Sequence, residues 1–162
     1  MERSKVVLRD FTDADIALME KWLYVPHVSD WYIAPDKWLK ELGKRGTEFS
    51  FITHLIAEYE GVPFGFCQYY DFFYGQEHED WLKTELPGEM FSIDYLIGDE
   101  RFLHQGFGQA IIAIMLEKLK GQGVKRVAVK PDRNNVKSNR ALEANGFVWV
   151  GTDYVLDLAA RR

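Results

Sequence analysis

The fold is decided by residues 91–108, which read FSIDYLIGDERFLHQGFG. Seven largely apolar residues open this stretch, and they predict a buried central strand over 91–97. Its end, Gln105–Gly108, leads into a helical pattern that we expect to run from Gly106 to Lys120. A helix N-terminus presents unpaired N–H groups and a positive dipole end, and glycine lets the backbone come close to a ligand. This order of strand, loop and helix indicates a phosphate-binding turn.

Further elements are predicted on both sides of this stretch. Thr12 is typical of a helix cap, Pro26 is expected to end that first helix, and Glu60-Gly61 favours a tight hairpin. We expect strands at 5–9, 49–58, 62–72, 91–97 and 124–129, with a last strand or strand pair at 147–158. Helices are expected at 12–24, 35–43, 106–120 and 138–145, and a polar, acidic connection at 73–89. The order β-α-α-β-β-β-α-β-α-β predicts an α/β protein whose mixed, mostly antiparallel central sheet is flanked by helices.

Length and composition suit one domain over residues 1–162. No apolar run is long enough to span a bilayer, and the first residues do not resemble a signal peptide. Cys67 is the sole cysteine, so no internal disulfide is expected, and a reducing cytoplasm is the expected location. The four histidines, at positions 27, 54, 78 and 104, lack metal-ligand spacing, which predicts no metal site.

The charge is distributed unevenly along the chain. The formal net charge of −5 disfavours nucleic-acid binding, which needs a clustered basic face. Residues 71–100 hold nine acids and one base, Lys83, a local charge of −8 that leaves +3 for the remainder. Such a segment attracts a cationic substrate, although a solvated acidic loop is the alternative.

A second motif lies about thirty residues downstream, at 135–147, and reads NVKSNRALEANGF. By itself it predicts a capped short helix with a glycine stop. Together with the Gly-x-Gly helix start, it resembles the GCN5-related N-acetyltransferase superfamily. The resemblance implies that fold, acetyl-coenzyme A as cofactor, and a pyrophosphate loop of the form Arg/Gln-x-x-Gly-x-Gly/Ala. Leu103 stands here at the Arg/Gln position, so only the backbone part of the cradle is kept.

Within the superfamily, three segments are similar to aminoglycoside 6′-N-acetyltransferases: EKWL at 20–23, VPFGFCQ at 62–68 and SIDYLIG at 92–98. That branch also tends to have leucine at the position of Leu103. Two residues depart from it: Lys130 replaces an aspartate and Tyr95 replaces a glutamine. The resemblance implies transfer of an acetyl group to the 6′-amine of an aminoglycoside or a similar polycation.

Asp94 is the expected catalytic residue. A carboxylate in an apolar strand is costly unless it is paired or functional. Strand alternation places Ser92, Asp94 and Leu96 on one face. An acceptor ammonium must lose a proton before its nitrogen attacks a thioester, and a nearby carboxylate can take up that proton. The resemblance implies that Asp94 acts as the base or binds the ammonium; pairing with Arg101 or strand-end hydrogen bonds is the structural alternative.

The remaining expected site residues follow from the same resemblance. The cofactor is expected to contact Leu96, Ile97, Leu103, Gln105, Gly106, Phe107, Gly108, Gln109, Asn135 and Ser138. The acceptor is expected to contact Trp22, Tyr70, Glu79, Asp80, Asp94 and Tyr95. Many family members use a tyrosine acid where this chain has Leu142, so either Tyr95, Tyr154 or water is expected to protonate the leaving thiolate, or the thiolate leaves without an acid.

Two other readings stay open. The 135–147 motif also looks like ribosomal-protein N-terminal acetyltransferases, which act on a peptide amine. A non-catalytic acetyl-coenzyme A sensor on the same fold is the alternative from another class. We expect a small-molecule amine as partner, no nucleic acid or membrane, and a monomer or homodimer.

Overall fold

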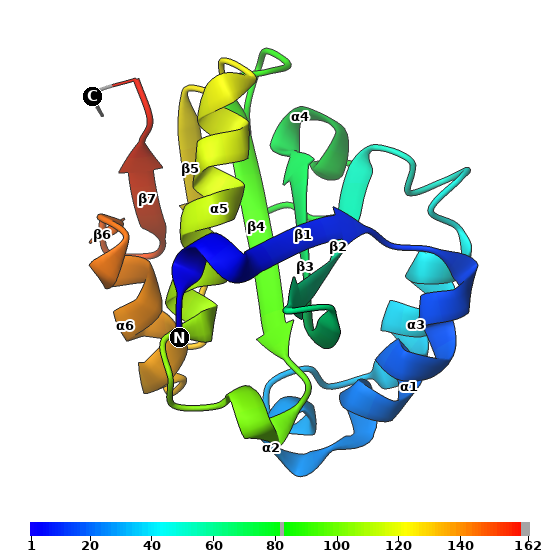
Figure 1. The fold of residues 1–162 in the computed structure, drawn as a ribbon. Coiled ribbons are helices and arrows are strands. Elements are labelled where there is room, and N and C mark those ends of the chain that lie inside the picture. Colours follow the sequence, from blue (N-terminus) through cyan, green and yellow to red (C-terminus); the bar gives the residue numbers. More distant parts are fainter. Residues whose placement is uncertain (82, 160–162) are drawn as a thin grey trace.

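Seven strands form one sheet in the computed structural model, which describes residues 1–81 and 83–159 (Figure 1). The strands are β1 (Val6–Asp10), β2 (Ile52–Tyr59), β3 (Val62–Asp71), β4 (Met90–Ile97), β5 (Arg126–Val129), β6 (Val148–Trp149) and β7 (Tyr154–Asp157). Their order across the sheet is β1-β2-β3-β4-β5-β7-β6. Only β4 and β5 are parallel, and every other neighbouring pair is antiparallel. This confirms the predicted mixed, mostly antiparallel sheet.

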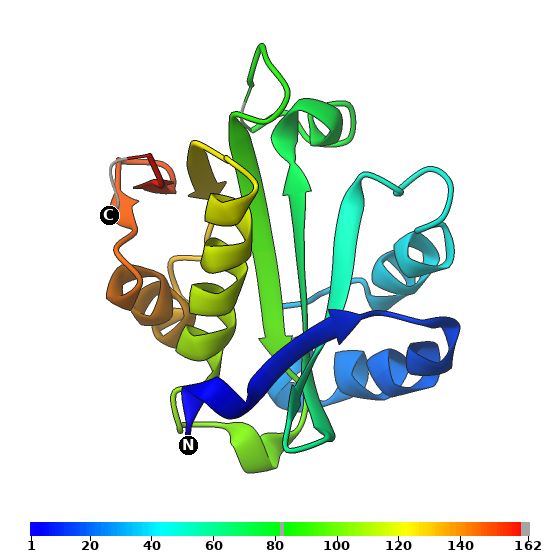
Figure 2. The ribbon, with the colours of Figure 1, turned by 45° about the horizontal axis from the view of Figure 1, so that its top comes forward.

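Helices cover both faces of the sheet. They are α1 (Ile16–Tyr24), α2 (Pro26–Ser29), α3 (Pro35–Gly43), α4 (Phe72–Gly75), α5 (Phe107–Gly121) and α6 (Val136–Ala144), with 3₁₀ turns η1 (Arg3–Lys5), η2 (Asp13–Asp15) and η3 (Glu100–Phe102). Figure 2 shows α5 and α6 on one side and α1 and α3 on the other. Each side has its own core, one built around α5 and the other around α1. Within the described residues, no helix is long and apolar enough to cross a membrane.

The β2–β3 hairpin turns where the sequence predicts. Glu60 has a φ of 50° and Gly61 a φ of 81°. Two successive positive φ values define the type I′ turn, whose twist matches that of the flanking strands. Register then follows, with Tyr59 opposite Val62.

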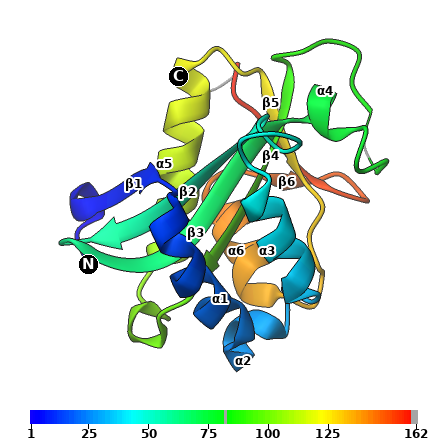
Figure 3. The same ribbon diagram turned by 90° about the vertical axis from the view of Figure 1, so that its right-hand side faces the viewer.

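Two short helices were not predicted. Pro26 follows the end of α1 but also begins α2, because the fixed φ of proline suits the first turn of a helix. The α4 helix interrupts the predicted 73–89 connection. Asp71 caps it: one carboxylate oxygen accepts from Phe73 N at 3.0 Å, and the other from Gly88 N at 2.7 Å. The α2 and α4 helices lie at opposite ends of the sheet (Figures 1 and 3).

Other boundaries are also corrected. Residues 49–51 form turns, so β2 begins at Ile52. The predicted final strand is the pair β6 and β7, and the first turn of the predicted 12–24 helix is the 3₁₀ turn η2, closed by a Thr12–Asp15 capping box.

The two edges of β4 are paired very differently. One edge pairs with β3 along its length, from Phe91 opposite Asp71 to Ile97 opposite Gly65. The other edge meets β5 only at Met90 and Phe91. Past Phe91 this second edge of β4 therefore has no strand beside it, and a space opens there.

Candidate active site

A groove of about 670 Å³ lies along the open edge of β4. Nine of the ten residues predicted to contact the cofactor line it: Leu96, Ile97, Leu103, Gly106, Phe107, Gly108, Gln109, Asn135 and Ser138. The tenth, Gln105, is exposed and lies outside the lining; its side-chain amide donates to Arg101 O at 2.6 Å. The two motifs of the sequence therefore meet in one groove.

The two glycines at the start of α5 have different structural reasons. Gly106 caps the helix with a φ of 85°, a conformation that only glycine adopts at low cost. At Gly108, an added Cβ would lie 2.9 Å from Cε2 of Tyr95. The second glycine therefore makes room for a tyrosine ring of the protein itself, which the sequence pattern did not reveal.

Backbone groups and cations make this groove suitable for a phosphorylated ligand. The first N–H groups of α5 lack intrahelical partners and point toward the helix start. Lys137 and Arg140 line the groove as cations, and His104 lies beside them, with Lys137 Nζ 3.1 Å from His104 Nδ1. Donors for the anionic part of coenzyme A are thus present, although the arginine or glutamine at the position of Leu103 is missing.

Side chains from the α2 region bind the open edge of β4 in place of a strand. The Tyr32 hydroxyl donates to Tyr95 O, and His27 Nε2 donates to Ile97 O at 2.9 Å. In an antiparallel strand, the N–H and C=O of one residue point to the same side. The N–H of Ile97 therefore points toward the groove together with its carbonyl.

A second cavity, of about 340 Å³, lies beside β4 on the face that carries Ser92 and Asp94. Its lining comes from six separate segments and comprises Trp38, Glu41, Phe49, Phe51, Ile52, Gln68, Tyr70, Gly75, His78, Glu79, Trp81, Ser92, Asp94, Val129 and Lys130. Asp94 and Tyr95 are neighbours in β4 and point to opposite faces, so Asp94 lies in this cavity and Tyr95 in the groove. The predicted alternation along 91–97 is confirmed.

Asp94 is held by a glutamine and not by a cation. Gln68 Nε2 donates to Asp94 Oδ2 at 2.9 Å, whereas Arg101 pairs with Asp99. The alternative pairing of Asp94 with Arg101 is therefore wrong. Burial raises the pKa of Asp94 to about 6; the Gln68 hydrogen bond opposes this rise and the charge of Glu79 adds to it. At neutral pH Asp94 is a carboxylate that still takes up a proton readily.

The acidic 71–100 stretch does not act as one surface. Asp71 is buried in the α4 cap, and Glu89 pairs with Lys125 at 3.2 Å. Only Glu79 and Asp94 of its nine acids line the cavity. Trp81 Nε1 donates to Glu79 Oε2 at 2.6 Å, and the Trp81 ring packs edge-on against Phe72 of α4.

Sequence reasoning missed Glu41, which reaches the same cavity from α3. It lies three residues after Trp38, so both side chains share one face of the helix. Burial, then Asp94 and then Glu79, raise the pKa of Glu41 to about 7. The amphipathic spacing around Trp38 was the signal in the sequence that pointed to this face.

Several predicted residues lie elsewhere. Trp22 is 3% exposed and packs against Gly98, where an added Cβ would lie 2.0 Å from Trp22 Cγ, so it belongs to the core. Asp80 is exposed and does not line the cavity, while Tyr70 does. The Tyr154 hydroxyl donates to Glu143 and accepts from Arg133, and its residue lines neither cavity. Cys67 is buried, and burial raises the pKa of its thiol.

A family model described as an acetyltransferase (GNAT) domain matches residues 11–152. The chain belongs to the GNAT acetyltransferase family. It is therefore an acetyl-coenzyme A-dependent N-acetyltransferase, and the resemblance between its motifs and that superfamily is confirmed.

Relatives and solved structures agree with this assignment. The chain is 24% identical over 158 residues to an aminoglycoside N(6′)-acetyltransferase type 1 of Klebsiella pneumoniae, covering 91% of this chain and 76% of the relative. The same values hold for the enzyme of that name from Serratia marcescens. The fold of this chain matches AAC(6′)-Ib in complex with paromomycin and acetyl-coenzyme A, with a TM-score of 0.84, 22% identity and 97% of both chains covered. An aminoglycoside N(6′)-acetyltransferase of Legionella pneumophila matches with a TM-score of 0.77 and 17% identity, covering 96% of this chain and 93% of that one.

Proposed function

We propose that this enzyme acetylates the 6′-amine of an aminoglycoside or a similar polycationic small molecule by direct transfer. The observation that carries the proposal is the acidic cavity beside β4, where Asp94, Glu79 and Glu41 come together. The names of the Klebsiella and Serratia relatives support the same acceptor class.

Different groove residues are suited to bind different parts of the acetyl donor. Acetyl-coenzyme A supplies an activated acetyl thioester when bound. The N–H groups at the start of α5 hold its pyrophosphate, with His104 and Lys137 nearby. The N–H of Ile97 is directed to the groove and would donate to the acyl oxygen, where negative charge would develop.

Asp94 prepares the acceptor. An alkyl ammonium is mostly protonated at neutral pH and cannot attack until it loses a proton. The Asp94 carboxylate binds the ammonium and takes up this proton, directly or through water. Gln68 holds the carboxylate in place through its 2.9 Å hydrogen bond. The nitrogen would then form its bond to the acyl carbon as the bond from that carbon to sulfur breaks, and the second proton that the nitrogen loses would pass to the departing sulfur or to water.

Tyr95 is the best placed acid for the leaving sulfur. Of Tyr95 and Tyr154, only Tyr95 lines the groove. Burial raises the pKa of its phenol, against the effect of a hydrogen bond with Ser138, so the phenol keeps its proton. Because a thiol has a pKa near 8.5, the thiolate also leaves without a strong acid.

Thiol release with acetyl-coenzyme A tests this function. The acceptors are kanamycin-type aminoglycosides, linear polyamines and peptides with free N-termini. We expect aminoglycosides with a free 6′-amine to give the highest kcat/KM, with the product mass increased by one acetyl group at that amine. Preference for peptides would move the enzyme to the N-terminal acetyltransferases, and cofactor binding without turnover of any amine would make it a sensor.

A further inference from the structure

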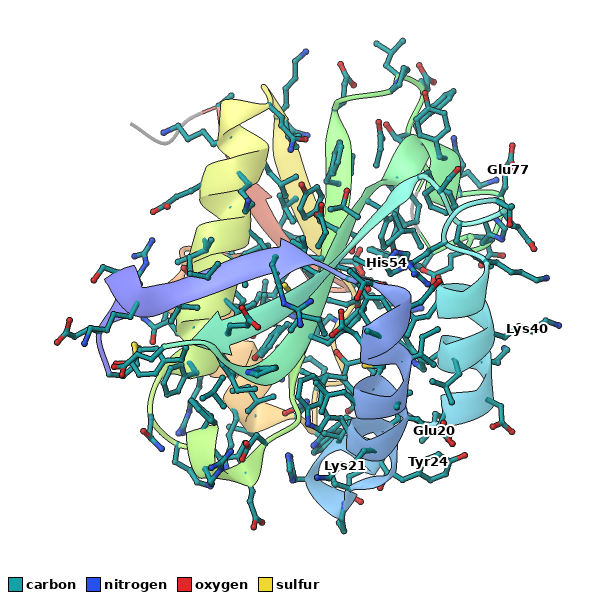
Figure 4. All side chains as sticks on the ribbon, turned by 45° about the vertical axis from the view of Figure 1, so that its right-hand side comes forward. Glu20, Lys21, Tyr24, Lys40, His54 and Glu77 are labelled. Atoms are coloured by element: carbon teal, nitrogen blue, oxygen red, sulfur yellow. The ribbon has the colours of Figure 1, made fainter. Side chains whose placement is uncertain are left out.

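Glu41 is a partly buried carboxylate without a cationic partner. Among the described residues, no hydrogen bond or ion pair reaches its side-chain carboxylate. Basic residues are plentiful on the same segment but are directed elsewhere: Lys44 pairs with Glu48 at 3.1 Å and Arg45 pairs with Asp13. Lys40, next to Glu41, points away from the molecule on the outer side of α3 (Figure 4). The protein thus leaves this negative charge uncompensated.

The surroundings of Glu41 add to the imbalance. Asp94 and Glu79 line the same cavity, so three carboxylates face one another across a space of about 340 Å³. Lys130 is the single lysine or arginine in that lining, and it is exposed on the opposite wall, just after the end of β5. With these groups ionised the cavity carries a net charge of −2, which an acceptor with two ammonium groups would balance.

Gln68 gives independent evidence that the cavity takes a hydrogen-bond donor. Its side chain is buried, at 3% exposure, and Asp94 fixes the orientation of the amide by accepting from Nε2. This orientation leaves Gln68 Oε1 buried without a hydrogen-bond partner among the described residues. An unpaired buried carbonyl oxygen is costly, and an ammonium group, with its several N–H bonds, removes that cost.

We infer that Glu41 is a specificity-determining residue that binds a second, non-reacting ammonium group of the acceptor, while Asp94 and Gln68 hold the reacting one. The second ammonium lies at the α3 wall, because Lys130 repels it from the β5 wall. This inference rests on the proposed function of the cavity. It restricts the class of acceptor to molecules with at least two amines close enough together to enter this cavity at the same time.

A double-mutant cycle between enzyme and acceptor tests this assignment. The enzymes are the wild type and Glu41→Gln, which keeps the size of the side chain and removes its charge. The acceptors are kanamycin B and analogues in which each non-reacting amine is replaced in turn by hydroxyl; kanamycin A is the analogue at the 2′ carbon. We expect Glu41→Gln to raise KM for kanamycin B about tenfold with little change in kcat. For one analogue, which already lacks the partner ammonium, the substitution has no effect.

Glu20→Gln is the matched control, because Glu20 is exposed on α1 and lies outside the cavity (Figure 4). It should leave every KM unchanged. The melting temperature of Glu41→Gln should be no lower than that of the wild type, since the variant removes repulsion among carboxylates. Equal effects of Glu41→Gln on all analogues would overturn the inference and leave the proposed function standing. Failure of the wild type to acetylate any of these acceptors would overturn both.

Discussion

The groove and the cavity beside β4 are built in different ways. The anion-binding part of the groove uses the backbone at the start of α5, and residues 27–32, 95–97 and 135–144 supply the rest of its lining. The cavity uses side chains from α3, β3, the segment after α4, β4 and the end of β5. A donor that all family members share suits a site made of backbone, whereas an acceptor that varies suits a site made of replaceable side chains.

This contrast has an energetic side. Groups at a helix start and a strand edge bind an anion without placing a new charge inside the protein. The cavity, by comparison, keeps carboxylates partly buried, and the pKa values of Asp94 and Glu41 rise to about 6 and about 7. The acceptor site is thus unfavourable until a cation enters it.

Asp94→Asn gives the largest effect expected from the cavity. Loss of a general base lowers kcat by about 10²- to 10⁴-fold. The amide keeps an oxygen that accepts from Gln68, so the fold persists, and relief of a buried charge keeps the melting temperature at or above that of the wild type. Steady-state kinetics and calorimetry measure both. Asp80→Asn, outside the cavity, is the control; a rate near normal in Asp94→Asn would remove Asp94 from the mechanism.

Gly108→Ala tests the groove. The new Cβ would lie 2.9 Å from Tyr95 Cε2, so we expect a loss of about 1–3 kcal/mol in the free energy of unfolding. We also expect KM for acetyl-coenzyme A to rise about tenfold, since the helix start is displaced.

A second variant separates this steric cause from others. Gly121→Ala lies at the other end of α5, and nothing is within 4 Å of its added Cβ, so it should be neutral or slightly stabilising. Combining Gly108→Ala with Tyr95→Leu removes the ring and should restore much of the stability. If the double variant unfolds as easily as the single one, the clash with Tyr95 is not the reason for the glycine.

The pH dependence of kcat/KM distinguishes the cavity from the groove. Asp94 must be ionised to accept a proton, and its pKa is about 6, so activity falls as the pH drops through 6. Below that value we expect about a tenfold loss per pH unit. The profile of Asp94→Asn should lack this step, and direct titration should show acetyl-coenzyme A binding unchanged near pH 6. A limb near pH 7 that survives in Asp94→Asn belongs to Glu41 and should vanish when Glu41→Gln is added, whereas a limb near pH 6 that survives in Asp94→Asn would assign that step to another group.

Lys130→Asp is expected to give the smallest effect, a modest change in KM for the acceptor. Lys130 is exposed, so a single charge there is worth about 0.2–1 kcal/mol. Reversing it should lower KM for the most highly charged aminoglycosides by about two- to fivefold and leave KM for acetyl-coenzyme A unchanged. The effect should shrink as salt is added. A rise in KM for the same acceptors would mean that Lys130 contacts the acceptor favourably.

The same division explains what the sequence made predictable. The hairpin at Glu60-Gly61, the glycine start of α5 and a capped short helix in the 135–147 motif depend on local backbone chemistry, and all three are present. The last helix begins at Val136, two residues before the predicted start, and Asn135 caps it. The order of strands and helices followed from their periodicity.

The missing parts depend on tertiary contacts. Trp22 is of a residue type that stacks on sugar rings. In the fold, however, its ring occupies a core position beside Gly98, where a Cβ would clash with it. Glu41 looks like an ordinary polar residue of a surface helix until α3 packs beside β3 and β4. Asp71 counts as one more acid in an acidic run, and only the fold shows that it joins both ends of the 72–88 segment.

The short contact between β4 and β5 has a mechanical consequence. Across that boundary the sheet is joined at two register pairs, Met90 with Arg126 and Phe91 with Val127. The part formed by β5, α6, β6 and β7 is therefore joined to the rest of the sheet by a narrow strand contact, and it shares one core with α5. A ligand that touches both β4 and α6 bridges this narrow contact, so occupancy of the groove should slow amide exchange in β5.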